Sequence, residues 1–318
     1  MGARSVSPGS EMREPRVQTG FVSTDGGLSL YWKATGEGPR TLICCNGVGV
    51  STFFWKFVVE HFASGDPGQG HRVVLWDYRG HGLSDRPHHP DAVDLSIQAC
   101  ARDLGRIQDA VGAEHAVLLG HSMGCQVVFE RALQAPDRVA GLVPMLGSAG
   151  RVLDTFYNTP NSARVFRLVY AMTELAGDRA NRFTRSFTRS SLIWPFVKWL
   201  RLVDPLYASR EDFIPYVDHL SELDLRLFLR MVRQAHLHDA FPRLQEIDSP
   251  TLIIAAERDD FTPLWVSRRM CDLLPLSDML ILADATHTGI IEQPRTINHR
   301  LERFLREEVS WPATPRGA

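Results

Sequence analysis

The sequence has no excess of charge of either sign. Its 35 Lys and Arg residues nearly balance its 37 Asp and Glu residues, which gives a formal net charge of -2 over 318 residues. Clustered Lys and Arg tracts are also absent, which argues against nucleic acid as the main partner. Because 44% of the residues are hydrophobic, the chain can bury a large core, as one large domain or as a domain with an insertion.

Cysteine is scarce, and its spacing is not that of a disulfide framework. The five cysteines form an odd set without C-x-x-C spacing, and Cys44 adjoins Cys45 in a short apolar run. This pattern predicts neither disulfides nor a zinc site, so we expect five reduced cysteines, most of them in the core. The histidine-rich segments at 88–89 and 236–239 lack convincing partners for a metal ion, and no phosphate-binding glycine loop is present. We therefore expect no cofactor and no metal.

Long apolar runs are missing as well. No segment reaches the length that a membrane-spanning helix requires. Residues 1–18 are polar and lack the continuous apolar stretch of a secretory signal. We expect a cytoplasmic protein in which residues 1–19 and 310–318 form flexible tails.

Strand and helix signals alternate along most of the chain. The turn sequence Asp25-Gly26-Gly27 separates extended segments at 21–23 and 28–34 and predicts an opening hairpin. Short apolar runs predict buried parallel strands over 41–45, 72–76, 116–119, 139–146, 251–255 and 279–282. Helical patterns lie between them, over 53–62, 97–111, 123–134, 265–274 and 290–307. This alternation indicates an α/β fold, a mainly parallel twisted sheet with helices on both faces.

The alternation stops near residue 150 and resumes near residue 244. Residues 151–244 contain no convincing strand, and the stretches 165–175, 196–202 and 223–232 are helix-like. We expect a helical cap inserted into a core of residues 20–150 and 245–309, above the carboxyl ends of the strands. The aromatic segment 192–200 has two interpretations. It could be a lid that lines an acyl pocket and transiently touches a lipid surface, or a helix that packs on its own neighbours.

The pentapeptide Gly120-His121-Ser122-Met123-Gly124 follows the apolar run 116–119 and precedes a predicted helix. It matches the G-x-S-x-G pattern, in which a sharp strand-to-helix turn exposes a serine hydroxyl at the sheet edge. Glycines flank the serine because a Cβ would collide with the neighbouring backbone. A serine hydroxyl is a poor nucleophile without a base, so the pattern directs attention to the other strand ends.

Two other strand ends carry the residues that a nucleophilic serine needs. His287 lies between the last predicted strand and the last predicted helix, where it can act as the base. Asp259 follows the strand predicted over 251–255, and a carboxylate there can fix the imidazole tautomer and stabilise the imidazolium. Asp260 is the second choice for this acid. The segment 46–49 follows the strand at 41–45, and we expect the backbone N–H groups of Val48 and Met123 to form an oxyanion hole.

With Ser122, Asp259 and His287 in this order, residues 20–307 resemble the capped serine hydrolases of the α/β-hydrolase superfamily. Residues 77–85 match the D-x-R-G-x-G-x-S turn of such proteins, which we interpret as a structural loop organised by glycine and an arginine. Residues 286–294 resemble the segment around the family histidine. Many relatives have His-Gly at 46–47, where this chain has Asn-Gly, so an amide is expected to support the loop. The strand-to-helix turn at 120–124 is called the elbow below. Cys125 replaces a glycine often found directly after the elbow and is interpreted as a small core residue.

The serine at the elbow predicts acyl transfer. Relatives that hydrolyse epoxides or carbon-halogen bonds are expected to carry aspartate there, so Ser122 argues against both reactions. We expect a serine hydrolase that cleaves an apolar ester through an acyl-enzyme. Two alternatives stay open: hydrolysis of a carbon-carbon bond or an enol lactone by the same triad, and a ligand-binding protein that retains the fold without catalysis.

Overall fold

Eight strands form one sheet in the computed structural model, which describes residues 15–63, 70–87, 89, 92–159, 161–199 and 210–311. The strands are β1 (Val17–Ser23), β2 (Ser29–Thr35), β3 (Arg40–Cys45), β4 (His71–Trp76), β5 (Ala116–His121), β6 (Val139–Met145), β7 (Thr251–Ala256) and β8 (Ser277–Leu282). Their order is β1-β2-β4-β3-β5-β6-β7-β8. The pairs β1–β2 and β2–β4 are antiparallel and the other pairs are parallel, which confirms the predicted mainly parallel sheet.

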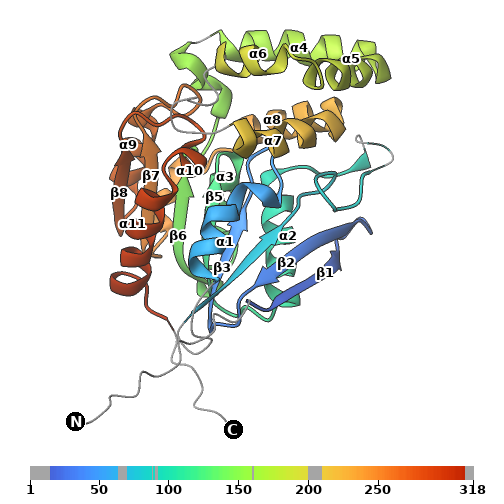
Figure 1. Cartoon of the computed structure of the whole chain (residues 1–318). Helices are drawn as coiled ribbons and strands as arrows, with labels where there is room; N and C mark the ends of the chain where they lie inside the picture. The colour runs from blue at the N-terminus through green and yellow to red at the C-terminus, as the bar shows by residue number, and fades with distance from the viewer. Residues whose placement is uncertain are drawn as a thin grey trace, which may run out of the picture.

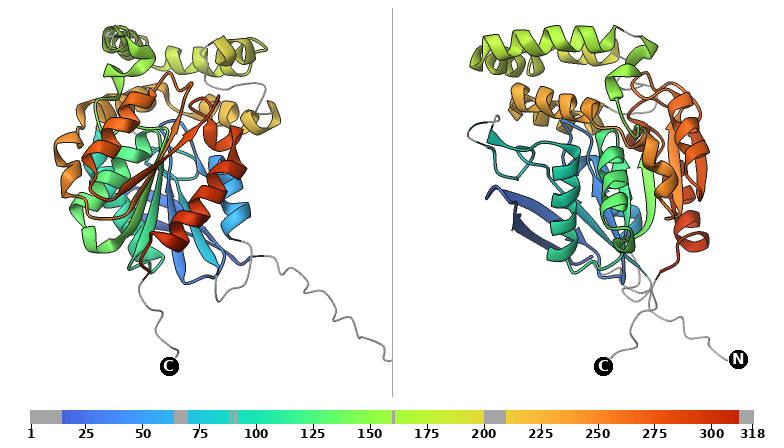
Figure 2. Two further views of the ribbon diagram at one scale, coloured as in Figure 1. Left: turned by 90° about the vertical axis from the view of Figure 1, so that its left-hand side faces the viewer. Right: turned by 180° about the vertical axis from the view of Figure 1, so that it is seen from behind.

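Helices cover both faces of this sheet (Figures 1 and 2). The core helices are α1 (Lys56–Phe62), α2 (Ile97–Ala110), α3 (Met123–Gln134), α9 (Leu264–Leu273), α10 (Gly289–Glu292) and α11 (Pro294–Glu307). Strand β3 shows why the central strands are apolar throughout. Ile43 and Cys45 belong to the cluster with α2 and α3, whereas Leu42 and Cys44 belong to the cluster with α1 and α11. Successive side chains of a strand point to opposite faces, and here both faces are buried.

The last predicted helix, 290–307, is two helices. Helix α10 ends at Glu292, Gln293 has extended φ of -130°, and α11 begins at Pro294. Proline lacks an N–H and clashes with the preceding turn, so it begins a helix more readily than it continues one. The periodicity of apolar residues alone did not reveal this break.

Five α-helices lie between β6 and β7 in the described part of this segment: α4 (Ser162–Ala176), α5 (Asp178–Thr188), α6 (Ile193–Trp199), α7 (Arg210–Glu222) and α8 (Leu225–Leu237). Figure 1 shows α7 and α8 against the core and α4, α5 and α6 in a second, outermost layer. The stretches predicted at 165–175 and 223–232 lie largely in α4 and α8. The stretch predicted at 196–202 begins within α6, and its residues 200–202 lie outside the described residues. Helices α5 and α7 were not predicted.

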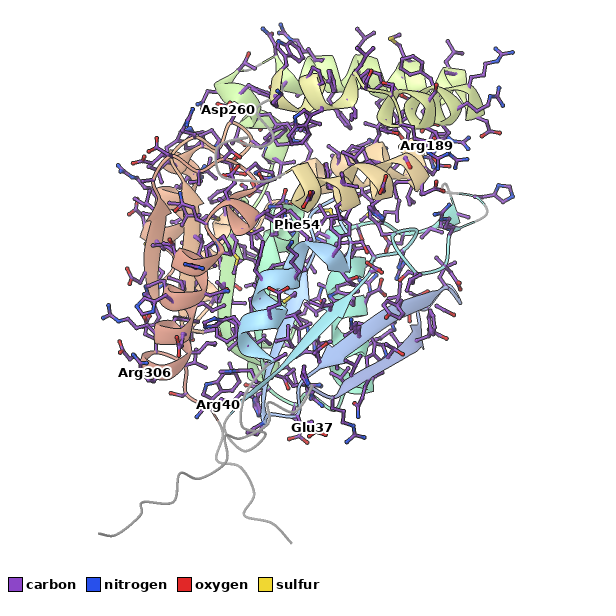
Figure 3. The ribbon with its side chains drawn as sticks, viewed as in Figure 1. Glu37, Arg40, Phe54, Arg189, Asp260 and Arg306 are labelled. Atoms are coloured by element: carbon purple, nitrogen blue, oxygen red, sulfur yellow. The ribbon has the colours of Figure 1, made fainter. Side chains whose placement is uncertain are left out.

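Ion pairs join the two layers of the cap. Arg189, labelled in Figure 3, lies 2.6 Å from the carboxylate of Glu222. In the other pairs the inner helix α8 supplies the arginine and the outer layer supplies the acid. Arg226 lies 3.0 Å from Asp178, and Arg230 lies 3.1 Å from Glu174. Because these groups are partly exposed, each pair contributes little stability alone, but together they fix which side of each helix faces the other layer.

The ends of the core differ from the expected tails. Strand β1 begins at Val17, so residues 17–19 pair with β2 and do not belong to a flexible tail. At the other end, Trp311 donates its indole N–H to the carbonyl of Leu305 at 3.1 Å. Residues 310 and 311 therefore belong to the core as well. No helix among the described residues is long and apolar enough to cross a bilayer, and all five cysteines are free thiols.

Residues 77–85 form a tight loop held by buried polar contacts. Arg79 donates two hydrogen bonds to the carboxylate of Asp103, at 2.7 and 2.8 Å, and one to the carbonyl of Asp94 at 2.7 Å. Asp77 accepts from the hydroxyl of Ser51 at 2.6 Å and from the N–H of Leu83 at 3.1 Å. These contacts tie the loop after β4 to α2 and to the segment after β3.

Replacing Arg79 with alanine should destabilise the fold. The side chains of Arg79 and Asp103 are 6% and 1% exposed, so the substitution leaves a buried carboxylate with a weaker set of donors. We expect a loss of about 3 kcal/mol in the free energy of unfolding, measured by urea denaturation. Arg303→Ala is the control, since its pair with Glu307 is exposed to solvent and should contribute little to stability. Equal losses for the two variants would contradict the structural role of Arg79.

Candidate active site

Ser122 stands on the turn between β5 and α3. Its backbone angles, φ 54° and ψ -118°, lie outside the helical and extended regions. Such a conformation costs about 1–3 kcal/mol and persists only where the surroundings enforce it. Here the N–H of Ser122 donates to the carbonyl of Met145 at 3.0 Å, and the Ser122 carbonyl accepts from Cys125 at 3.0 Å. The turn thereby presents the serine side chain at the carboxyl edge of the sheet.

The elbow requires glycine because backbones meet there at close range. A Cβ on Gly120 would lie 2.5 Å from the carbonyl oxygen of Gly124, and a Cβ on Gly124 would lie 2.2 Å from that of Cys45. Cys125 is fully buried, and its thiol donates weakly to the Gly120 carbonyl at 3.2 Å. Burial raises the pKa of this thiol well above its ordinary value, so Cys125 is a core residue and is unsuited to be a second nucleophile.

The structure brings together the three side chains predicted to form the triad. His287 Nε2 lies 3.0 Å from Ser122 Oγ, and His287 Nδ1 lies 2.9 Å from Asp259 Oδ2. The geometry fits one tautomer, in which Nδ1–H donates to the carboxylate and Nε2 accepts from the hydroxyl. Asp259 follows β7, and His287 follows β8, so convergence at one sheet edge results from the parallel topology.

Asp259 is the acid that contacts the histidine. Its Oδ1 accepts from the backbone N–H groups of Phe261 at 2.8 Å and Thr262 at 2.9 Å, which leaves Oδ2 for His287. The carboxylate is fully buried. The contact with His287 Nδ1 is therefore made by the first of the two predicted acids.

The loop that carries His287 is held on both sides. The Glu292 carboxylate accepts from the N–H and hydroxyl of Thr286, at 2.7 and 2.6 Å, and from the hydroxyl of Thr288 at 3.0 Å. On the other side, the buried ring of His121 contacts the His287 carbonyl through Nε2 at 3.0 Å. A carbonyl only accepts, so His121 donates from Nε2 and is fixed as that tautomer. Burial lowers the pKa of His121 to about 3, which keeps the ring neutral.

The loop at 46–49 is held by an amide, as its sequence suggested. Asn46 donates to the carbonyl of Trp76 at 2.8 Å and accepts from the indole N–H of Trp55 at 2.8 Å. Gly47 lies directly beside the elbow, since a Cβ there would be 3.1 Å from the Ser122 Cβ. The neighbouring Val48 lines the same cavity as Ser122. Met123, the other expected oxyanion donor, is the first residue of α3 and is buried.

His81 supports the 46–49 loop from the side of the core, a role that the sequence did not reveal. Its Nε2 accepts from the N–H of Gly49 at 3.2 Å, and its Nδ1 donates to the Arg79 carbonyl at 3.2 Å. Burial lowers the pKa of His81 to about 3, so the ring keeps its acceptor. Gly49 has φ of +73°, and a Cβ there would lie 2.7 Å from Phe228 of cap helix α8. The loop is therefore held between a core imidazole and the cap.

A cavity of ≈ 700 Å³ connects Ser122 with the cap. Its lining is mainly apolar and includes several aromatic rings, with Phe54 from the core, labelled beneath the cap in Figure 3, and Phe156, Phe187, Phe196 and Phe228 from the insertion. No Asp, Glu, Lys or Arg of the described residues lines it. Such a surface takes up neutral apolar groups, because a charged group would lose its hydration without gaining a partner.

The histidine-rich segments do not assemble a metal site within the described residues, where no group of three His, Cys, Asp or Glu side chains is placed to hold an ion. His88 lies outside the described residues. His238 is buried in a structural contact, with Nε2 3.1 Å from Glu130 and Nδ1 3.2 Å from the amide of Gln126.

Comparisons with known proteins agree on the fold. A family model described as the alpha/beta hydrolase fold matches residues 40–294. A Variovorax paradoxus protein, whose name carries the provisional assignment carbamate hydrolase RutD, is 29% identical over 293 residues, covering 91% of this chain and 100% of its own length. The 2-hydroxy-6-oxononadienedioate/2-hydroxy-6-oxononatrienedioate hydrolase of Paraburkholderia xenovorans is 26% identical over 306 residues, covering 95% and 97%. Among solved structures, a thermophilic esterase from Thermogutta terrifontis superposes with a TM-score of 0.69 at 21% identity, covering 92% and 100%.

The contact between Asp259 and His287 predicts a large effect of Asp259→Asn on serine reactivity. An amide accepts less strongly and can also donate, so it stabilises the wrong histidine tautomer. We expect the rate of Ser122 labelling by a fluorophosphonate probe to fall by roughly three to four orders of magnitude. Asp260→Asn is the matched control and should label at close to the wild-type rate. A larger effect at position 260 than at position 259 would reverse the assignment.

Proposed function

The chain belongs to the alpha/beta hydrolase fold family, and from this premise we propose that it is a serine hydrolase that cleaves carboxylic esters through an acyl-enzyme on Ser122. The observation that carries the proposal is the chain of contacts from Ser122 through His287 to Asp259, at 3.0 and 2.9 Å, at the floor of an apolar cavity. In an ordinary strand-to-helix turn, the serine would have no reason to contact side chains that follow two other strands.

The reaction begins when His287 Nε2 accepts the proton of the Ser122 hydroxyl as Oγ attacks the ester carbonyl. Asp259 accepts a hydrogen bond from the other ring nitrogen and stabilises the imidazolium that forms. The tetrahedral intermediate collapses when Nε2 returns the proton to the leaving alcohol, which leaves the acyl group on Ser122. A water molecule, deprotonated by the same histidine, then releases the acid and restores the serine.

The negative oxygen of the intermediate needs donors that are in place before the reaction. We assign this role to the backbone N–H groups of Val48 and Met123, one on each side of Ser122. Each such donor is worth about 3 kcal/mol of transition-state stabilisation. Two hydrogen bonds of the loop support this assignment, since they restrict its movement relative to the elbow: the Asn46 amide donates to the Trp76 carbonyl, and the Gly49 N–H donates to His81.

The lining of the cavity favours an ester with an apolar acyl or alcohol group. The Paraburkholderia xenovorans relative acts, by its name, on dioates, which carry two carboxylates. A carboxylate in a buried site needs a cation or several donors, and among the described residues the cavity offers no Lys or Arg. The cavity therefore supports a neutral ester over a dioate substrate of carbon-carbon bond hydrolysis.

Ser122→Ala should abolish hydrolysis of a p-nitrophenyl ester and labelling by a fluorophosphonate, because it removes the hydroxyl that contacts the imidazole of His287. Circular dichroism would verify that the variant is folded. Retained turnover in the variant would sink the assignment of the nucleophile. A folded wild-type protein with an unreactive Ser122 would instead favour a non-catalytic binding protein.

A matched pair of substrates tests the preference for apolar groups. The p-nitrophenyl ester of hexanoate and the mono-p-nitrophenyl ester of adipate differ mainly in a terminal carboxylate. We expect kcat/KM for the charged ester to be lower by about 100-fold or more, because its carboxylate loses hydration in the cavity. Enol lactones and vinylogous diketones complete the panel. Equal rates for the two esters, or faster cleavage of a carbon-carbon substrate, would contradict the proposed specificity.

A further inference from the structure

The outer layer of the cap exposes apolar side chains to an unusual degree. Nine of the eighteen large apolar side chains that are exposed in the described residues lie within residues 161–199, which form α4, α5 and α6. Figure 1 shows this layer as the outermost part of the molecule, separated from the sheet by α7 and α8. Single exposed apolar residues are ordinary, but a concentration on one layer marks an interaction surface.

Helix α4 carries the densest part of this surface. Leu168, Met172 and Leu175 are 63%, 61% and 91% exposed. Their spacing of three or four residues places them along one side of the helix. Val165 and Val169 extend the same side, and both also line the cavity above Ser122. The exposed side of α4 is thus continuous with the wall of the candidate active site.

A row of aromatic rings makes a second connection between cavity and surface. Phe183 stacks on Phe187 with ring centroids 6.2 Å apart, Phe187 meets Phe196 at 5.2 Å, and Phe196 meets Trp199 at 5.9 Å. The two middle rings line the cavity, whereas the outer two, Phe183 and Trp199, are 72% and 74% exposed. An apolar molecule could therefore pass from the surface to the cavity over apolar contacts.

The same layer is basic. Residues 161–199 contain seven Lys and Arg residues but only two acids, Glu174 and Asp178. Both acids already pair with arginines of α8. Arg167, Arg179 and Arg182 are exposed on α4 and α5. Since the whole chain is slightly acidic at -2, the excess of positive charge is a local property of this layer.

A layer that exposes apolar side chains and also carries an excess of cations fits the surface of an anionic lipid bilayer. Lys and Arg are drawn to the lipid headgroups, while Leu, Met, Phe and Trp enter the boundary with the acyl chains. A second copy of this chain is a poorer occupant, because it would bring an equally basic layer against this one. We propose that α4, α5 and α6 bind the surface of an anionic bilayer, from which an apolar substrate reaches the cavity. Binding itself is independent of the proposed ester hydrolysis; only the path of the substrate rests on it.

The binding test uses Ser122→Ala protein, so that hydrolysis does not alter the lipids. Co-sedimentation is measured with vesicles of phosphatidylcholine alone and of an equimolar mixture of phosphatidylcholine and phosphatidylglycerol. We expect binding to the mixed vesicles that weakens as salt is added, and much weaker binding to neutral vesicles. Because turnover is not measured, this result stands or falls separately from the proposed function.

Two double variants and one control locate the surface. Leu168→Ser with Met172→Ser should weaken binding to mixed vesicles by about tenfold or more. Arg179→Gln with Arg182→Gln should weaken it by about fivefold for each cation removed. Leu276→Ser removes a side chain that is 55% exposed between α9 and β8, away from the cap, and should bind as before. The same substitutions with Ser122 intact should retain fluorophosphonate labelling, which shows that the site is still assembled.

Three results would overturn the proposal. Binding that does not require the anionic lipid would remove the role of the cations. Binding that is unaffected by the cap variants, or equally weakened by Leu276→Ser, would place the surface elsewhere. A dimer in analytical ultracentrifugation that dissociates on Leu168→Ser with Met172→Ser, without vesicle binding by the wild-type sequence, would identify the second copy as the occupant.

Discussion

The site depends on the close approach of backbone segments around Ser122. Gly124 lies against the carbonyl of Cys45 at the end of β3, and a Cβ on Gly147 would lie 2.4 Å from the Ser122 carbonyl. These contacts hold Ser122 at a positive φ that it would not otherwise adopt. The same contacts fix the distance from the elbow to the loop after β3, so Ser122 and the expected oxyanion donors form one unit.

Three histidines surround this unit, and their environments differ. His287 is partly accessible from the cavity and faces a carboxylate, an environment that suits its proposed role as the base. His81 and His121 are buried without a carboxylate in contact, and burial lowers the pKa of each to about 3. Both remain neutral, so each can keep one nitrogen as an acceptor or donor for the backbone. One residue type therefore serves as a candidate base and as structural support within the same site.

The sheet and the triad could be predicted from the sequence, because each depends on a local pattern. Apolar runs reveal strands buried on both faces, and the carboxyl ends of parallel strands meet at one edge. The supporting histidines could not be predicted this way. His81 contacts a residue 32 positions away, and His121 contacts one 166 positions away. Helix α5 was missed because Asp178–Thr188 is largely polar, and its helical form depends on contacts with the other cap helices.

The glycine beneath the cap limits how this enzyme can acquire new specificities. A Cβ on Gly49 would lie 2.7 Å from Phe228 of α8 and 3.1 Å from Leu220 of α7. A change in the inner cap layer that pushes either side chain toward the core would therefore displace the loop beside Ser122. Within the described residues, the side chains nearest to a Cβ at position 49 come from α7 and α8 and not from the outer layer. Evolution, or a protein engineer who exchanges caps between relatives, can therefore vary α4, α5 and α6 with less effect on that loop than a change in α7 or α8 would have, provided that the ion pairs between the two layers are kept.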